Sequence, residues 1–302
     1  MKVAVIVLSY NSAGYISDCL TSLLKLALGD IQLQVIVVDN ASTDDSVKLV
    51  SEKFPSVTVI SNSQNVGYAE GNNVGIRQAL ADNADFIWIV NPDVTVDHEA
   101  LSELMLASTK YPAAGIFGSK IYFAPGFEFH KDRYSKKDLG HVIWYAGGQV
   151  DWDNVQAVHR GVDQVDTGQY NRDIEVDFVT GASMFIRRRV FETTGLIDPV
   201  FFLYFEENDF CQRASKNGWK LMYVAKSICW HANAQATGIG SSLQDYYTTR
   251  NRLLFGTRHA SVYTKLLLLK ESIGMYFHGR PWQRRGVIDF YSHKLGAGSY
   301  QP

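Results

Sequence analysis

The stretch 86–94 constrains the fold more than any other part of this chain. It opens with five apolar residues, FIWIV, whose β-branched and aromatic types are typical of a strand buried on both faces. Pro92 cannot continue a central ladder, so the strand ends near Asn91, with Asp93 just beyond it. Open α/β sheets bind their ligands at the carboxyl ends of such strands. A simple turn made by Asn-Pro-Asp explains these residues equally well, so the neighbouring segments have to decide.

The segments around this strand alternate between strand and helix. Apolar runs predict strands at 3–8, 34–38, 57–61, 115–123, 175–179 and 220–224, and a short apolar patch ends at 228–231. Helical spacing predicts helices at 15–28, at 99–110, and before the central strand as far as Leu80. This order predicts an α/β fold with right-handed crossovers and a mostly parallel sheet flanked by helices.

Polar loops follow the first three strands and are expected to meet at one edge of the sheet. Ser9, Tyr10 and Asn11 follow the first strand, Asp39 ends the second, and the glycine-rich segment 65–73 follows the third. In a parallel sheet the carboxyl ends of these strands lie side by side. We therefore expect a ligand site at this edge.

The glycine-rich segment has no known phosphate-binding fingerprint. Gly67, Gly71 and Gly75 do not make G-x-G-x-x-G, and no G-x-x-x-x-G-K-[ST] motif is present. Its glycines could simply permit tight turns. Asn65, Gly67 and Asn72 nevertheless lie where a loop opens a helix, a place that suits a nucleotide or phosphate.

An acidic cluster follows the aromatic run 201–205. It delivers Glu206, Glu207 and Asp209 to the start of a helix that extends to Asn217. Acidic residues also suit a helix N-terminus on dipole grounds alone. Two adjacent carboxylates after an apolar run should raise at least one pKa, as a general base requires, and this favours a functional role.

Composition separates a large body from a basic extension. Residues 245–302 hold 9 Lys and Arg against 3 Asp and Glu, a net +6, whereas the whole chain has a net charge of −2. We expect a domain at 1–244 and a basic helical extension at 245–302 that contacts a membrane surface, an acceptor or a sister subunit. No nucleic acid is expected as a partner. Three dispersed cysteines, without metal-type spacing, indicate reduced thiols and a cytosolic compartment.

Taken together, these motifs resemble family 2 glycosyltransferases, and most closely the rhamnosyltransferase-type branch. The resemblance covers nearly the whole chain and rests on residues 9–11, 38–42, 65–75, 91–93, 180–182, 205–211 and His231, together with 146–148, 151–152, 159–161 and 245–259. It implies a GT-A fold, a nucleotide-sugar donor, a divalent cation, and inversion at the transferred sugar.

The resemblance also implies roles for particular residues. Asp39 would read the nucleobase, with Ser9, Tyr10 and Asn11 nearby, and Gly181 would lie at the donor site. Asp93 would match the second carboxylate of a D-x-D metal motif.

Asn91 replaces the first carboxylate of that motif, which puts this metal ligand in doubt. His231 would complete the shell of Mn²⁺ or Mg²⁺, although a lone histidine is more often a hydrogen-bonded structural residue. Glu207 would be the catalytic base, with Glu206 and Asp209 supporting it or contacting the acceptor.

The implied reaction is an inverting transfer of a hexose to a hydroxyl group. The preferred donor is dTDP-rhamnose, from which L-rhamnose is transferred, and a UDP-sugar is the alternative donor. The acceptor would be a bacterial surface polysaccharide or a lipid-linked oligosaccharide, such as an O-antigen precursor. The enzyme would be cytoplasmic and peripheral at the inner face of the cytoplasmic membrane. Two alternatives stay open: a non-catalytic sugar-nucleotide-binding protein, which Asn91 favours, and a sugar nucleotidyltransferase, which the first loop disfavours.

Overall fold

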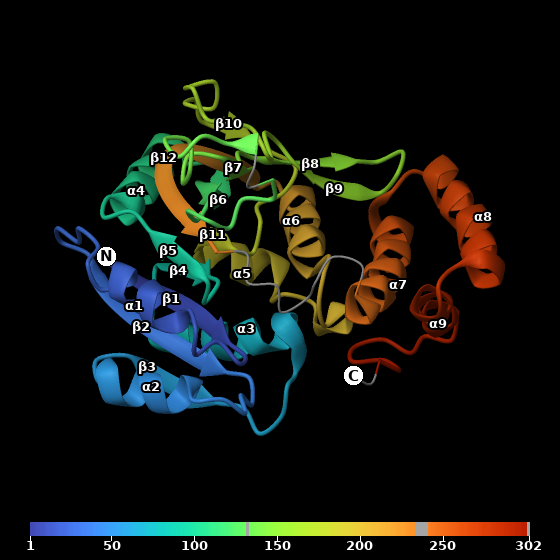
Figure 1. The fold of residues 1–302 in the computed structure, drawn as a ribbon, viewed down its shortest axis with the longest axis horizontal. Helices are drawn as coiled ribbons and strands as arrows, with labels where there is room; N and C mark the ends of the chain where they lie inside the picture. The colour runs from blue at the N-terminus through green and yellow to red at the C-terminus, as the bar shows by residue number, and fades with distance from the viewer. Residues whose placement is uncertain (131–132, 233–240, 301–302) are drawn as a thin grey trace.

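A computed structural model describes residues 1–130, 133–232 and 241–300. Within this part of the chain, a ten-stranded sheet runs in the order β10-β12-β6-β11-β4-β1-β2-β3, with β5 paired to β12 and β7 to β6 (Figure 1). Its strands are β1 (Lys2–Ser9), β2 (Gln32–Asp39), β3 (Thr58–Ser61), β4 (Phe86–Val90), β5 (Val94–Val96), β6 (Ala114–Phe123), β7 (Ile143–Tyr145), β10 (Ile174–Glu175), β11 (Ser183–Arg187) and β12 (Lys220–His231). A separate hairpin pairs β8 (Gly148–Asp151) with β9 (Gln156–His159).

The described helices flank this sheet and extend beyond it. They are α1 (Ile16–Leu23), α2 (Ser46–Lys53), α3 (Gly67–Ala81), α4 (Ala100–Lys110), α5 (Arg188–Thr194), α6 (Glu206–Lys216), α7 (Ser242–His259), α8 (Val262–His278) and α9 (Pro281–Tyr291), with a 3₁₀ turn at Pro199–Phe201. Helices α7, α8 and α9 pack side by side beyond α6, on the side away from β1, β2 and β3 (Figure 1).

The sheet is mostly parallel and buried at its centre. Strands β3, β2, β1 and β4 run parallel to one another. Strand β11 lies antiparallel between β4 and β6, and β12 runs parallel to β6. Every residue of β4 is buried, as its apolar sequence predicts. This confirms the expected α/β architecture and puts the ends of β1, β2 and β4 at one edge.

Three expected elements differ in extent. Helix α1 ends at Leu23 rather than at 28, because the chain turns and the Ala27 N–H donates to the carbonyl of His98. The run 175–179 is a strand only at Ile174–Glu175; Val176 and Phe178 are buried as loop residues, without a continuous ladder. The strand expected at 220–224 continues through the apolar patch 228–231 as one strand, β12, with an irregularity between Val224 and Ile228.

The division of the chain at residue 245 stays a prediction. Helix α7 begins at Ser242, where the Ser241 hydroxyl accepts the Gln244 N–H at 3.2 Å, so the expected boundary falls inside this helix. Of the residues on α7, Tyr246, Tyr247, Arg250, Asn251 and Phe255 are almost completely buried. The beginning of the basic extension is therefore packed as part of the core.

Candidate active site

Ser9 and Asp39 form the base of a polar site at the ends of β1 and β2. The two residues are register partners, only 1% and 3% exposed. Asp39 Oδ2 accepts the Ser42 N–H at 3.1 Å. Asp39 Oδ1 and Ser9 Oγ are buried and have no hydrogen-bond partner among the residues that the structure describes. A buried polar atom without a hydrogen-bond partner costs free energy of folding unless a ligand supplies the partner. Ser9 and Asp39 are therefore suited to hydrogen-bond a polar ring.

The loop after β1 closes one side of this pair. Asn11 adopts a left-handed backbone, with φ of 51°, and its Oδ1 accepts the Thr43 N–H at 2.8 Å. The side chain of Asn11 thus holds the two loops together. Tyr10 is 46% exposed at the rim, where its ring is available for stacking.

The glycine-rich segment is tied mainly to neighbouring backbone. Asn65 Oδ1 accepts the Gly67 N–H and an Asn40 side-chain N–H, both at 2.9 Å. Gly67 has φ of +84°, and a Cβ there would lie 2.5 Å from the ring of Phe202. Asn72 is buried and donates to the Tyr68 carbonyl within α3. These contacts fix where α3 begins relative to the turn that precedes α6.

Asp93 and His231 lie together at the ends of β4 and β12. His231 Nε2 is 3.1 Å from Asp93 Oδ2, and the histidine is only 5% exposed. The other ring nitrogen, Nδ1, is buried without a partner in the described part of the chain. A carboxylate and an imidazole at this distance are a donor set that suits a divalent cation. Among the described residues, no third His, Cys, Asp or Glu side chain joins this pair.

Tyr68 connects this pair with the acidic cluster, and the sequence reasoning missed it. Its hydroxyl lies 3.2 Å from Asn91 Oδ1 and donates to the carbonyl of Gly181 at 2.8 Å. Burial, followed by the negative charges of Glu207 and Glu206 and, more weakly, Asp93, raises the pKa of Tyr68 well above its usual value. Tyr68 thus lies within the field of both carboxylate groups. An aromatic residue inside a glycine-rich loop is the signal that could have identified it.

Glu206 and Glu207 open helix α6, where Glu206 is buried and Glu207 is partly buried. Each has one carboxylate oxygen, Oε2, that is buried without a partner in the described ranges. Burial raises the pKa of Glu207 to about 7. Burial and the charge of Glu207 raise the pKa of Glu206 well above its usual range. A buried carboxylate that is half ionised near neutral pH is suited to take a proton from a substrate hydroxyl.

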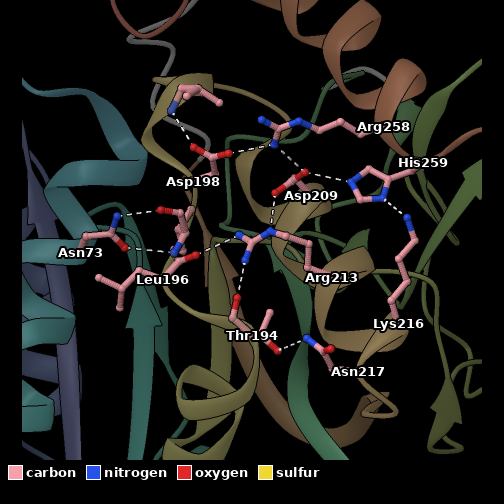
Figure 2. Close-up of polar contacts among 12 residues, drawn as sticks. Asn73, Thr194, Leu196, Asp198, Asp209, Arg213, Lys216, Asn217, Arg258 and His259 are labelled. Atoms are coloured by element: carbon pink, nitrogen blue, oxygen red, sulfur yellow. Dashed lines mark hydrogen bonds and ion pairs between the residues drawn. The ribbon is translucent and has the colours of Figure 1, made fainter.

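Asp209 belongs to a different set of contacts. Its Oδ2 accepts from Arg213 at 2.7 Å, and its Oδ1 lies 2.8 Å from His259 Nε2 and 3.1 Å from Arg258 (Figure 2). Burial alone would raise the pKa of Asp209, but the hydrogen bonds from His259 and Arg213 lower it to about 2. Both oxygens are engaged by cationic or imidazole groups, so Asp209 secures α6 to α7.

Helix α7 also holds the turn that leads to Glu206. Asn251 Nδ2 donates to the carbonyls of Phe201, Leu203 and Tyr204, at 2.7, 2.8 and 2.9 Å. Arg250 donates to the same Phe201 carbonyl at 2.9 Å. Both side chains are completely buried. The sequence reasoning missed this pair because a buried Arg-Asn inside a helix has no local pattern that marks it as part of a site.

Curated relatives of the chain transfer sugars, as their names state. It is 24% identical over 299 residues to the N-acetylglucosaminyl-diphospho-decaprenol L-rhamnosyltransferase of Mycobacterium tuberculosis, covering 96% of this chain and 92% of that protein. It is 25% identical over 231 residues to the rhamnosyltransferase WbbL of Escherichia coli K12, covering 74% and 80%.

Solved structures support the fold. The chain resembles GalNAc-T7, solved with UDP, GalNAc and Mn²⁺, with a TM-score of 0.63 and 14% identity, over 93% of this chain and 59% of that one. This confirms the GT-A architecture. The family model described as glycosyl transferase family 2 matches residues 4–195, well over half of the sequence. The chain is therefore a member of glycosyl transferase family 2, and a glycosyltransferase.

Proposed function

We propose that this enzyme transfers a sugar, with inversion, from a nucleoside diphosphate to a hydroxyl group of a glycan acceptor. The observation that carries the proposal is the carboxylate pair at the start of α6, of which Glu206 is buried and Glu207 has a pKa of about 7. The charges of Glu207, Glu206 and Asp93 all raise the pKa of the Tyr68 hydroxyl, so the carboxylate pair and the proposed metal ligand Asp93 lie around one side chain. A base and a cation-binding pair at one site are what a single displacement requires.

The nucleobase is assigned to the Ser9–Asp39 pair. Asp39 Oδ1 is a buried acceptor without a partner in the described ranges, and it would accept the ring N–H of thymine or uracil. A dTDP-sugar, with L-rhamnose as the transferred group, is preferred because two relatives are named rhamnosyltransferases. A UDP-sugar satisfies the same acceptor and is the alternative donor.

Asp93 and His231 would hold the Mn²⁺ or Mg²⁺ ion, and the orphaned Nδ1 of a buried His231 supports a ligand in this region. When bound, such a cation stabilises the negative charge on the departing diphosphate. Asn91 Oδ1 lies within hydrogen-bond reach of Tyr68, and it can still offer a neutral oxygen ligand. A metal site with one carboxylate instead of two is expected to bind the ion more weakly.

Glu207 acts as the base in this mechanism. Its carboxylate takes the proton from the acceptor hydroxyl as the oxygen attacks the anomeric carbon, and the bond from that carbon to the diphosphate breaks on the opposite face. One displacement inverts the configuration, and no sugar becomes attached to the protein. Glu206, whose pKa is raised by burial and by the charge of Glu207, can in its protonated form donate a hydrogen bond to the acceptor or to Glu207.

The acceptor is proposed to be a surface polysaccharide or a lipid-linked oligosaccharide on the cytoplasmic side of the membrane. The name of the Mycobacterium tuberculosis relative specifies a sugar on a diphospho-decaprenol carrier. No helix in the described part of this chain is long and apolar enough to cross a membrane. The enzyme would then meet a carrier-linked acceptor at the membrane surface.

Calorimetric titration with dTDP, UDP and GDP, each with and without Mn²⁺, tests the donor assignment. Tight binding of dTDP or UDP that strengthens with Mn²⁺ and is lost in Asp39→Ala supports it, and preference for GDP contradicts it. Release of the nucleoside diphosphate in the presence of a lipid-linked acceptor tests the transfer. Donor binding without turnover on any acceptor would support the non-catalytic alternative.

A further inference from the structure

Helix α8 exposes an apolar face that nothing in the described chain covers. The outward face carries large apolar side chains that are 45–75% exposed: Val262, Leu266, Leu269, Ile273, Tyr276 and Phe277. Their spacing follows one side of an α-helix. A soluble helix normally turns such residues toward the core, and a contiguous exposed set marks an interaction surface.

The orientation of α8 is set by its opposite side. Thr264, Leu268 and Ser272 are its buried residues, and Leu268 packs against Gly256 of α7. Ser272 Oγ also lies 2.8 Å from the Tyr291 hydroxyl of α9. The helix is therefore docked by a narrow, partly polar face, and its wider apolar face is exposed. Helix α8 itself lies at the edge of the molecule (Figure 1).

Lysines border the apolar face on both sides. At about 100° per residue, Lys265 lies on one border, next to Tyr276, and Lys270 on the other, next to Phe277. Long cationic side chains in this position can place their stems on apolar surface and their charges at its rim. An apolar stripe with a cation on each border is typical of a helix that lies in a membrane interface.

Helix α9 extends both the apolar and the cationic character. Ile288 and Tyr291 line a groove of about 470 Å³ together with Ile273, Tyr276 and Phe277 of α8. From 262 to 294 the chain has 6 Lys and Arg but only Glu271 and Asp289 as acids. Glu271 is paired with Arg252, Asp289 is buried against Tyr246 and paired with Arg285, and Arg280 is paired with Asp245. None of these acids offsets Lys265 or Lys270 at the border of the apolar face.

We propose that the α8–α9 surface, defined by Val262, Leu266, Leu269, Ile273, Tyr276, Phe277, Ile288 and Tyr291, docks on a bilayer that contains anionic phospholipid. Charge complementarity selects this occupant: a second copy of the chain would bring Lys265 and Lys270 against the same cations. The apolar side chains insert at the level of the acyl chains and the lysines contact lipid phosphates. This docking does not depend on which donor or acceptor the enzyme uses.

Vesicle co-sedimentation of the full chain tests this surface. We expect binding to vesicles of phosphatidylcholine with phosphatidylglycerol, weaker binding to phosphatidylcholine alone, and a loss of about tenfold or more in the double variant Leu266→Glu, Ile273→Glu. Replacing Lys265 or Lys270 by Gln should weaken binding to the anionic vesicles by roughly fivefold each, with little effect on neutral ones.

Leu106→Glu is the matched control, since Leu106 on α4 is 62% exposed, as Leu266 is at 61%, but lies elsewhere on the molecule. It should bind vesicles as the unaltered chain does. Thermal melts and donor titrations of every variant should match the parent, which separates this test from that of the proposed function. Failure of the parent to bind anionic vesicles, or equal loss in Leu106→Glu, overturns the proposal. A dimer that dissociates in the double variant, without vesicle binding, would identify a second copy as the occupant.

Discussion

The side-chain nitrogen of Asn251 lies 2.9 Å from the carbonyl oxygen of Tyr204, two residues before the carboxylate pair of α6. Tyr204 and its neighbours Phe202 and Phe205 all have positive φ angles, between 64° and 71°. Each costs of order 1–3 kcal/mol for a residue with a side chain. The buried side-chain amide of Asn251 stabilises this turn. The conformation of the turn then determines where Glu206 and Glu207 point.

Asn251→Ala should therefore destabilise the protein and slow transfer together. Three carbonyl groups each lose one donor, although Arg250 still donates to the Phe201 carbonyl, and we expect the free energy of unfolding to fall by about 3 kcal/mol. Chemical denaturation measures this change. The turnover number should fall more than donor affinity, because Asn251 acts on the turn and not on the nucleotide site. Thr257→Ala, an exposed position on the same helix, should change neither quantity, and a stable, fully active Asn251→Ala would contradict the role of this contact.

Glu207→Gln should abolish transfer while preserving donor binding. The amide has the shape of the carboxylate but cannot accept a proton, and the loss of a general base typically slows a reaction by about 10²–10⁴-fold. Single-turnover transfer and a dTDP or UDP titration measure the two effects separately. If Glu207→Gln transfers sugar at the normal rate, the base must be Glu206 instead.

The pH dependence of transfer should follow the ionisation of Glu207. Activity is expected to rise with pH, with a midpoint near pH 7, because only the ionised form accepts the proton. The raised pKa has the opposite effect on stability: the contribution of Glu207 is fully present below its ordinary pKa of 4.5 and is lost as the pH rises through about 7. Thermal melts between pH 4 and 8 should show a larger loss in the parent than in Glu207→Gln, in which burial still raises the pKa of Glu206. A flat activity profile across pH 6–8 would argue against the assignment.

Asp93→Ala should remove the effect of Mn²⁺ on donor binding. Without this carboxylate, His231 is the remaining side chain of the proposed pair, and titration of the nucleoside diphosphate should give one affinity with or without the metal ion. Asp18→Ala, at an exposed position of α1, provides the control for a lost surface carboxylate. Retention of the Mn²⁺ effect in Asp93→Ala would move the metal site elsewhere.

The sequence predicted the central sheet because its strands are continuous apolar runs. Buried β4, with Asp93 just after it, and the paired ends of β1 and β2 follow from that pattern and from the carboxyl-edge rule. The pattern overextended the strand at 175–179, where Val176 and Phe178 are buried in a loop. Burial alone does not distinguish a strand such as β4 from a buried loop such as 176–178, because a strand is defined by its backbone hydrogen bonds to neighbouring strands.

The site was predictable where residues adjacent in sequence act together, and not where distant ones meet. The pair Glu206 and Glu207 was visible as an acidic cluster after an aromatic run. Tyr68 and Asn251 could not be identified in that way, since their roles depend on contacts with Gly181 and with the 201–204 carbonyls across long stretches of chain. The same limit applies to Asp209, whose partners Arg258 and His259 come from α7.

The dependence of the 201–205 turn on Arg250 and Asn251 has a consequence for how the protein is made. On the ribosome, α6 emerges before α7, so Glu206 and Glu207 are synthesised while the donors that order their turn are still missing. The nascent chain can form β1, β2 and β4 early. Glu206 and Glu207 take their final positions only when α7 has folded against the turn that precedes them. A shortened product that stops before residue 242 would keep the ends of β1 and β2 and lack the donors that order the turn before Glu206. Formation of this turn is thus tied to the synthesis of α7.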